Sequence, residues 1–288
     1  MAEITSLSEA VRTLIKDGDT VAFEGFTHLI PSAAALEAIR QDKRDLALIR
    51  MTPDIIYDQF IGMGLTRRLV FAWGGNPGVG SLHRLRDAVE NNWPQPLELD
   101  ERSHADMANA YAAGASGLPF AVFRGHLGDD LPKVNPRLKR VTCPFTGEVL
   151  AAVPATNPDV GVLHAQRADK RGSVLLWGII GIQKEVALAS RHTIVTVEEI
   201  VDDLQAPPNA CILPHFTLDA VCLEPHGAWP SYAQGFYKRD NGFYKAWDDI
   251  ARERDGFLAW MKRHVMATKN FAEFEASVKS AAKETAHV

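Results

Sequence analysis

The sequence has no excess of positive charge. Its 288 residues include 31 Lys and Arg against 36 Asp and Glu, which gives a formal net charge of −5. A nucleic-acid-binding domain usually carries a clustered excess of Lys and Arg. We therefore expect no nucleic-acid partner.

Long apolar runs are also missing. The segment MAEITSLSEAVRTLIKDGD at residues 1–19 has neither the basic region nor the apolar region of a signal peptide. Elsewhere no apolar stretch approaches the roughly 18 residues that a membrane span requires. The sequence predicts a cytoplasmic protein that does not associate with membranes.

Residues for metal binding or nucleophilic catalysis are sparse. The three cysteines, Cys143, Cys211 and Cys222, are scattered and odd in number, so we expect buried reduced thiols rather than a disulfide framework. No two of the ten histidines are four residues apart, so no metal site is predicted. The Gly-x-Ser-x-Gly motif of serine hydrolases is absent as well.

Short apolar segments alternate with helical ones through most of the chain. This order favours an α/β fold with an open, mainly parallel, doubly wound sheet. The predicted strands are Thr20–Phe26, Leu46–Met51, Arg68–Trp73, Leu97–Leu99, Phe120–Arg124, Val149–Val153, Val160–Leu163, Ser173–Trp177, Thr193–Val197 and Leu218–Leu223. The predicted helices are Ser6–Lys16, Ala33–Gln41, Ser81–Asn91 with Ser81 as N-cap, Ser103–Ala115 and Ile182–Ala189.

The C-terminal part has a different character. Residues Trp229–Lys245 are rich in aromatics and glycine without a regular period, and two helices are predicted after them, Tyr244–Met266 and Phe271–Lys283. We expect an α/β domain over residues 1–228. Residues 229–288 would form a helical C-terminal extension packed on it.

Two glycine-containing loops follow predicted strands. The first is Val21–Pro31, in which Glu24, Gly25, Phe26, Thr27 and His28 come after the apolar run. Ligands of open α/β sheets bind beyond the carboxyl ends of the strands, and a glycine there lets the backbone approach them. These five residues are therefore candidates for substrate binding, although a glycine at a strand end can also simply form a turn.

The second loop is Gly74–Gly80, which begins Gly74-Gly75-Asn76. It lacks the Lys-Ser/Thr ending of a P-loop. Gly74, Gly75 and Asn76 are candidates for lining an active-site crevice, with a plain turn as the alternative.

Acidic residues follow the strand Leu97–Leu99. A carboxylate such as Glu101 at a strand end can act as a general base if burial raises its pKa. The alternative, which we favour, is that Asp100, Glu101 and Ser103 stabilise the N-terminus of the next helix.

Two segments identify a family. Residues Asp159–Gly178 contain two apolar runs around a charged turn, Arg167–Arg171, that closes on Gly172, and Glu224–Ser231 reads EPHGAWPS. Together they resemble the A (alpha-type) subunit of class I CoA-transferases, closest to the glutaconate type. The resemblance extends over nearly the whole chain.

The Val21–Pro31 loop also resembles the signature of this family. The run Asp17-Gly18, Val21–Phe23, Gly25-Phe26 and Pro31 is similar to it, but Glu24 is present where the family usually has a glycine. A carboxylate near the expected acyl site could alter the choice of substrate, or could pair with a cation.

The resemblance implies a mechanism in which a glutamate takes up CoA from an acyl-CoA as a thioester and passes it to a second carboxylate. In the family that glutamate belongs to the B subunit, so no certain catalytic residue is assigned here, and Glu24 and Glu101 remain candidates. This chain would supply pocket walls. The partners would be a B subunit, in an α2β2 or larger assembly, and acyl-CoA and carboxylate substrates. Coenzyme A would be a substrate, with no tightly bound cofactor.

Two other functions are compatible with the same fold. One is hydrolysis of a CoA thioester or of a ring in an acyl-CoA, with Glu24 or Glu101 as base. The other is a non-catalytic subunit that binds acyl-CoA. The sequence of the partner would distinguish transfer from hydrolysis.

Overall fold

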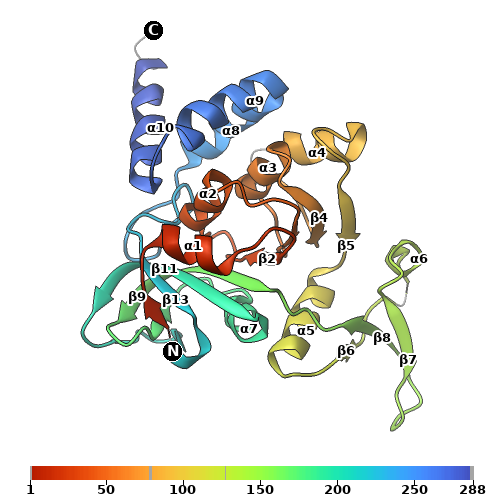
Figure 1. Cartoon of the computed structure of the whole chain (residues 1–288). Helices are drawn as coiled ribbons and strands as arrows, with labels where there is room; N and C mark the ends of the chain where they lie inside the picture. Colours follow the sequence, from red (N-terminus) through yellow and green to blue (C-terminus); the bar gives the residue numbers. More distant parts are fainter. Residues whose placement is uncertain (1, 78–79, 127, 286–288) are drawn as a thin grey trace.

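The main sheet is long and mostly parallel. The computed structural model describes residues 2–77, 80–126 and 128–285. The strand order is β1-β13-β11-β9-β2-β3-β4-β5, and the pairings along it are parallel (Figure 1). These strands are β1 (Glu3–Ile4), β2 (Thr20–Phe23), β3 (Leu46–Ile49), β4 (Thr66–Phe71), β5 (Glu98–Glu101), β9 (Val160–Asp169), β11 (His192–Val201) and β13 (Ala220–Leu223).

Helices cover both faces of this sheet, as predicted for a doubly wound fold. Successive residues of β2 show why: Val21 and Phe23 belong to one apolar core, and Ala22 between them belongs to the other. The first core lies beneath α1 (Leu7–Leu14), α2 (Ser32–Arg40), α3 (Ile55–Gly62) and α4 (His83–Asn91). The second lies beneath α5 (His104–Ala115) and α7 (Gln183–Ala189). A strand buried on both faces explains the continuous apolar runs in the sequence.

The C-terminal extension adds more helices to the first core. They are α8 (Asn241–Arg252), α9 (Arg254–Trp260), the π-helix η2 (Met261–Met266) and α10 (Phe271–Thr285). Trp247, Phe257 and Phe271 are buried in the same cluster as Val21 and Phe23. The extension therefore shares a core with the α/β body, while the exact boundary at residue 228 stays a prediction.

The prediction of one helix over Tyr244–Met266 was wrong. The chain adopts an extended conformation at Glu253, with a ψ of 137°. Beyond the break, the Arg254 guanidinium makes two 2.7 Å bonds to the Asp87 carboxylate of α4. A tertiary ion pair, which the local periodicity does not encode, accompanies the change in direction.

A second, separate sheet projects from the body as an arm. Its strands are β6 (Phe120–Phe123), β8 (Val149–Pro154) and β7 (Lys139–Thr142), antiparallel in the order β6-β8-β7, with the short helix α6 (Leu131–Val134) (Figure 1). The sequence predicted β6 and β8 but placed them with the other strands. β7, between them in the chain, was not among the predicted strands.

The charged turn of the family-defining segment is shorter than predicted. β9 continues to Asp169, where it pairs antiparallel with β10 (Val174–Leu176), and β10 pairs with β12 (Cys211–Leu213). Arg167 thus lies in a strand, with its Nε 2.9 Å from Glu199. Asp169 is buried and accepts the N–H groups of Arg171 and Ser173. The predicted charged turn over Arg167–Arg171 is thus confined to its last two residues, Lys170 and Arg171, because Arg167 and Asp169 belong to β9.

The N-terminus of α4 also differs from the prediction. Leu82, not Ser81, is the N-cap, and it makes no capping hydrogen bond through its side chain. Instead the buried Asp58 of α3 accepts the N–H groups of Arg84 (2.9 Å) and Leu85 (2.8 Å), together with the indole N–H of Trp247. Burial raises the pKa of Asp58 to about 6. A remote carboxylate replaces the local cap.

The remaining regular element is the 3-10 turn η1 (His215–Thr217). Within the part of the chain that the structure describes, no helix is both long and apolar enough to cross a membrane.

Candidate active site

The loop after β2 is held in an unusual backbone conformation. Thr27 and Leu29 have positive φ values of 59° and 54°, a region that non-glycine residues rarely occupy. A Cβ on Gly25 would lie 2.6 Å from the Leu29 carbonyl oxygen, so only glycine fits there. Backbone strain of this kind is often found at ligand-binding loops.

Residues from the C-terminal part fix this loop. The Ser231 hydroxyl donates to the Thr27 carbonyl (2.9 Å), and the Leu29 N–H donates to the Tyr232 carbonyl (3.0 Å). The N–H groups of Phe26, Thr27 and His28 have no acceptor among the described residues. The loop thus presents free backbone donors beyond the end of β2.

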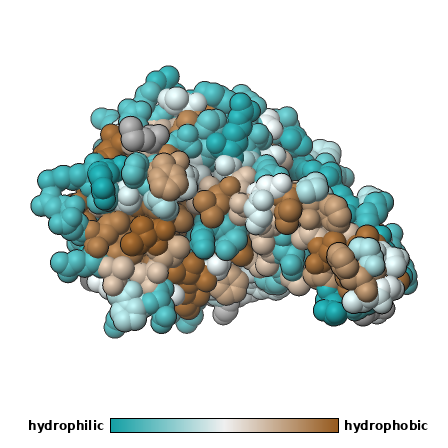
Figure 2. Space-filling model, turned by 90° about the horizontal axis from the view of Figure 1, so that it is seen from below, coloured by the Kyte–Doolittle hydropathy of each residue, from teal (hydrophilic) through white to brown (hydrophobic). Residues whose placement is uncertain are grey.

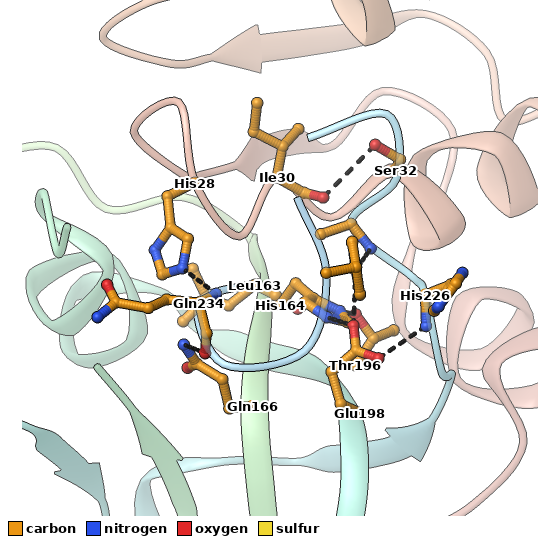
Figure 3. A network of polar contacts seen from close by, with 12 residues as sticks. His28, Ile30, Ser32, Leu163, His164, Gln166, Thr196, Glu198, His226 and Gln234 are labelled. Atoms are coloured by element: carbon orange, nitrogen blue, oxygen red, sulfur yellow. Dashed lines mark hydrogen bonds and ion pairs between the residues drawn. The ribbon is translucent and has the colours of Figure 1, made fainter. Parts of the chain in front are cut away.

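His28 fastens the loop from a buried position (Figure 3). Its Nε2 accepts the N–H of Gln234 at 2.9 Å, which requires that nitrogen to be unprotonated. Its Nδ1 donates to the Ile179 carbonyl at 3.2 Å. Burial lowers the pKa of His28 to about 4, in agreement with a neutral ring. In the isolated chain His28 therefore connects three segments instead of facing solvent.

Glu24 lies at the end of β2 and is 1% exposed. Its Oε1 accepts the Gly25 N–H at 3.2 Å, and its Oε2 has no hydrogen-bond partner within the described ranges. Burial raises the pKa of Glu24 to about 7, although the positive charge of Arg50 opposes this shift. The carboxyl is thus close to half-protonated at neutral pH.

Arg50, beyond the end of β3, is the cation whose charge acts on Glu24. Its Nη2 donates to the Gly25 carbonyl (2.7 Å) and its Nη1 to Asp54 Oδ1 (2.9 Å). Both side chains are buried. Holding the Gly25 carbonyl sets the orientation of the following peptide, whose N–H belongs to Phe26.

The second predicted loop adjoins this arrangement. The Gly75 N–H donates to the Pro53 carbonyl next to Asp54. The Asn76 amide donates to the Tyr244 carbonyl at 2.6 Å. The structure therefore brings Gly74–Asn76 and the Glu24–His28 loop to the same edge of the sheet. Gly78 and Val79 of this loop lie outside the described residues.

Buried polar atoms without partners in the described part of the chain are concentrated here. Besides Glu24 Oε2 they include Arg50 Nε, Asp54 Oδ2, Asn76 Oδ1 and Tyr111 Oη. Unsatisfied buried polar groups are few in native proteins and call for a ligand, a water molecule or a partner. Sequence reasoning missed Arg50, Asp54 and Tyr111, because only the fold places the strand ends and α5 side by side.

Asp100 of β5 is the centre of a cluster of ion pairs and hydrogen bonds. Asp100 lies inside β5 and pairs with Arg68, Arg102 and Arg137, and it accepts a 2.8 Å bond from Asn135. Burial alone would raise the pKa of Asp100, but its bonds to Arg102, together with those cations, lower it. The predicted role of Asp100 at a helix N-terminus was therefore wrong.

The cap of α5 is built by neighbouring residues. Ser103 is the N-cap, and it forms a reciprocal capping box with Asp106. The His126 ring lies between Asp106 (2.6 Å) and Asp129 (2.7 Å) and joins this helix end to the arm. Glu101, the last residue of β5, is exposed, and its side chain makes no hydrogen bond to any described residue.

A cavity of about 530 Å³ opens beside this strand end. Its walls include Ala72, Glu101, Arg102, Ser103, His104 and Val134. The loop after β4, the end of β5 and helix α6 of the arm thus line it, and it is widely open to solvent. Glu101 lines this space, whereas Glu24 does not and is buried.

A buried hydrogen-bond network supports the family-defining segments (Figure 3). Glu198 accepts bonds from His164 Nε2 (2.7 Å), the Tyr237 hydroxyl (2.6 Å) and the N–H of His226 (2.7 Å). Although burial opposes it, these donors lower the pKa of Glu198. The network ties β9 and β11 to EPHGAWPS, and that segment ends at Ser231, which bonds the Thr27 carbonyl of the loop after β2.

Among the described residues, no three His, Cys, Asp or Glu side chains lie close enough together to bind a metal ion. All three cysteines are free. Cys222 is buried as predicted, but Cys143 and Cys211 are only partly buried.

Comparisons with known proteins identify the family and agree with the fold. A family model described as coenzyme A transferase matches residues 4–224. The chain is 64% identical to the A subunit of the 3-oxoadipate CoA-transferase of Pseudomonas knackmussii, over 96% of this chain and 99% of the relative. It is 32% identical to the A subunit of the glutaconate CoA-transferase of Acidaminococcus fermentans, over 95% of this chain and 91% of the relative.

A solved structure agrees with these matches. The crystal structure of glutaconate CoA-transferase from Acidaminococcus fermentans superposes with a TM-score of 0.88 at 30% identity, covering 96% of this chain and 93% of that one. Contact of substrate with Glu24–His28, Gly74–Asn76 or Glu101 stays a prediction. The chain therefore belongs to the coenzyme A transferase family, as the A subunit of a CoA-transferase built from two kinds of chain.

Proposed function

We propose that this chain serves a CoA-transferase that exchanges CoA between an acyl-CoA and a 3-oxo dicarboxylic acid of the 3-oxoadipate type. The observation that carries the proposal is the 64% identity to the A subunit of a 3-oxoadipate CoA-transferase over nearly the full length of both chains. Identity to the corresponding chain of the glutaconate enzyme is half as high. The acid would therefore be a 3-oxo acid rather than glutaconate.

The loop after β2 would act on the acyl group. Its free N–H groups, at Phe26, Thr27 and His28, are donors of the kind that stabilise the negative charge developing on a thioester carbonyl oxygen. Arg50 supports this role because it holds the Gly25 carbonyl and so turns the next N–H away from the protein interior. Glu24 and Arg50 would be positioning residues here.

Arg102 would recognise the distal carboxylate of the acid. It lines the cavity at the end of β5, and its Nη1 is buried without a hydrogen-bond partner among the residues that the structure describes. Its remaining bonds go to Asp100, which fixes the guanidinium in place. A fixed arginine fork suits a carboxylate better than a flexible lysine would.

A B-type subunit would complete the enzyme. The cavity is widely open to solvent, and acyl transfer requires a site from which water is excluded. We expect this partner to supply the missing wall and the CoA-carrying glutamate, in an α2β2 or larger assembly. Coenzyme A would enter as a substrate, and no tightly bound cofactor is needed.

The experiment is to co-express this chain with the product of the adjacent gene and to follow CoA exchange by mass spectrometry. The acceptors compared are 3-oxoadipate, glutaconate and 3-oxohexanoate, which lacks the distal carboxylate. We expect kcat/KM for 3-oxoadipate to exceed that for 3-oxohexanoate by about 100-fold or more, because a site built for a polar group rejects analogues without it.

Two variants test the role of Arg102. Arg102→Gln should reduce this preference to nearly one, whereas Arg137→Gln, a half-exposed member of the same ion-pair cluster, should preserve it. Release of free CoA with every acceptor, without exchange, would instead identify a hydrolase. An equal preference in both variants would remove Arg102 from the proposal.

A further inference from the structure

The arm formed by β6, β8 and β7 has an apolar face that this chain leaves uncovered. Opposite residues in an antiparallel sheet point to the same side. The registers Val122↔Ala152 and Phe120↔Pro154 place four apolar side chains on one face. Leu150↔Val141 extends this face onto β7. We call it the outer face.

The opposite face of the arm is already used. Ala121, Phe123 and Val153 form a small core with Ala110 of α5 and Leu138. On the outer face, by contrast, Phe120 is 45% and Val122 is 42% exposed. An antiparallel sheet with one solvated face normally alternates apolar and polar residues. Most side chains on both faces of this arm are apolar.

The arm projects from the body, and apolar surface is visible where it does so (Figures 1 and 2). Phe145, between β7 and β8, is 93% exposed, and Leu118 before β6 is 54% exposed. Adjoining exposed apolar side chains that together form a larger patch can mark protein–protein contacts. A small three-stranded sheet also gains stability when a second layer covers it.

We propose that the outer face of the arm is a docking surface for the B-type partner. This inference rests on the proposed pairing of two different chains. The face alone spans only about 200 Å², given strands about 4.8 Å apart, whereas a stable interface buries about 800 Å² on each partner. The partner therefore has to extend beyond the sheet, towards Leu118 or Phe145.

Charge favours this partner over a second copy of the same chain. Lys139 lies opposite Ala152, hence on the outer face, and it has no carboxylate partner among the described residues. A twofold contact of two outer faces with its axis near Lys139 would bring the two Lys139 ammonium groups towards each other. A different chain can place an acidic side chain there instead.

The location also couples docking to the active site. Helix α6, between β6 and β7, forms a wall of the cavity at the end of β5 through Leu131 and Val134. His126, at the base of the arm, is bonded to Asp106 of α5. A partner seated on the arm would thereby fix one wall of the substrate cavity.

The test measures binding of the purified B-type partner to variants of this chain by calorimetry. We expect the double variant Phe120→Ser, Val122→Ser to weaken the Kd at least 30-fold, and Lys139→Glu to weaken it at least 5-fold. The matched control is Phe216→Ser, since Phe216 is 70% exposed in η1, away from the arm. Its Kd should be unchanged.

A second measurement on the wild-type chain does not depend on the variants' folding. Hydrogen exchange of β6 amides should slow on addition of the partner. Unchanged Kd values and unchanged exchange in β6 would overturn the docking surface while leaving the assembly intact. If the arm variants abolish self-association of this chain instead, the face belongs to a second copy and the inference fails. If the wild-type chain binds no partner, the proposed assembly itself fails.

Discussion

Glu24 and Asp100 are buried carboxylates near the ends of two strands of one sheet, and folding shifts their pKa values in opposite directions. Glu24 is 1% exposed and Asp100 is 4% exposed. Burial raises the pKa of Glu24 to about 7. For Asp100 the cations and hydrogen bonds around it outweigh burial, and its pKa is lowered.

The difference follows from the number of donors that each carboxylate receives. Asp100 has Arg68, Arg102 and Arg137 around it, and Asn135 donates to it as well. Among the described residues, the cation near Glu24 is Arg50, whose two bonds go to Asp54 and to the Gly25 carbonyl. Both side chains are nearly inaccessible to solvent, but Glu24 is the more deeply enclosed, and only around Asp100 do the donors outweigh burial.

The comparison separates two kinds of site. The end of β5 is a fixed ionic cluster, which can hold a guanidinium rigidly. The end of β2 is an incompletely satisfied pocket whose carboxyl changes protonation near neutral pH. The two should therefore respond to pH in opposite directions, because a lowered pKa stabilises the fold above it and a raised pKa stabilises the fold below it.

The largest effect is expected from breaking the ionic cluster. Asp100→Asn leaves Arg102 buried without its counter-charge, which should cost about 4 kcal/mol of unfolding free energy. The measurement is urea unfolding at neutral pH. Glu98→Gln removes an exposed partner of Arg68 and should cost less than about 0.5 kcal/mol. Equal losses in both variants would contradict the account of Asp100.

A somewhat smaller effect tests the opposite ionisation of Glu24. Its carboxyl binds a proton more tightly in the folded chain, so stability should fall as the pH rises from about 4.5 to about 7. Glu24→Gln cannot ionise. Its stability relative to the wild type should therefore rise by about 3 kcal/mol over that interval. Urea unfolding of both proteins at about pH 4.5 and about pH 8 gives the stability difference between variant and wild type at each pH. Asp58 is present in both proteins, so its own titration cancels in that difference. A difference that does not change with pH would show that folding leaves the pKa of Glu24 unshifted.

The smallest effect is expected from a variant that alters the backbone of the loop after β2 and leaves Glu24 in place. Ser231→Ala removes the bond to the Thr27 carbonyl and should cost about 1 kcal/mol of stability. In the assembled enzyme kcat/KM should fall about tenfold, because the free N–H groups lose their orientation.

The matched control for this variant is Ser190→Ala. The Ser190 hydroxyl donates to Val186 at the end of α7, away from the loop. A similar loss of stability is expected, with kcat/KM unchanged. If both variants reduce kcat/KM alike, the bond to Thr27 has no particular role in catalysis.

Local patterns in the sequence predicted the body of the fold well. The alternation of apolar strands with helices is legible because each strand of a doubly wound sheet is buried on both faces, as Val21, Ala22 and Phe23 illustrate. The N-cap role of Ser103 was also readable, since its partner Asp106 is three residues away. The ordered motifs predicted the family, which the comparisons confirm.

Contacts between residues far apart in the chain could not be predicted from the sequence. Asp58 caps α4 from α3, and Arg254 pairs with Asp87 across the helix break. Neither contact has a fixed spacing along the chain. The same holds for the arm, whose strands resemble those of the main sheet locally but pair only with each other.

The sequence by itself determined the α/β class, the family and the two loops, because periodicity, glycine positions and ordered motifs are local properties. Only the tertiary structure decided the chemistry around them. It brought Arg50 and Asp54 beside Glu24, surrounded Asp100 with arginines and left one face of the arm bare. A carboxylate takes its pKa from the donors and solvent within a few ångströms, and folding alone assembles those neighbours.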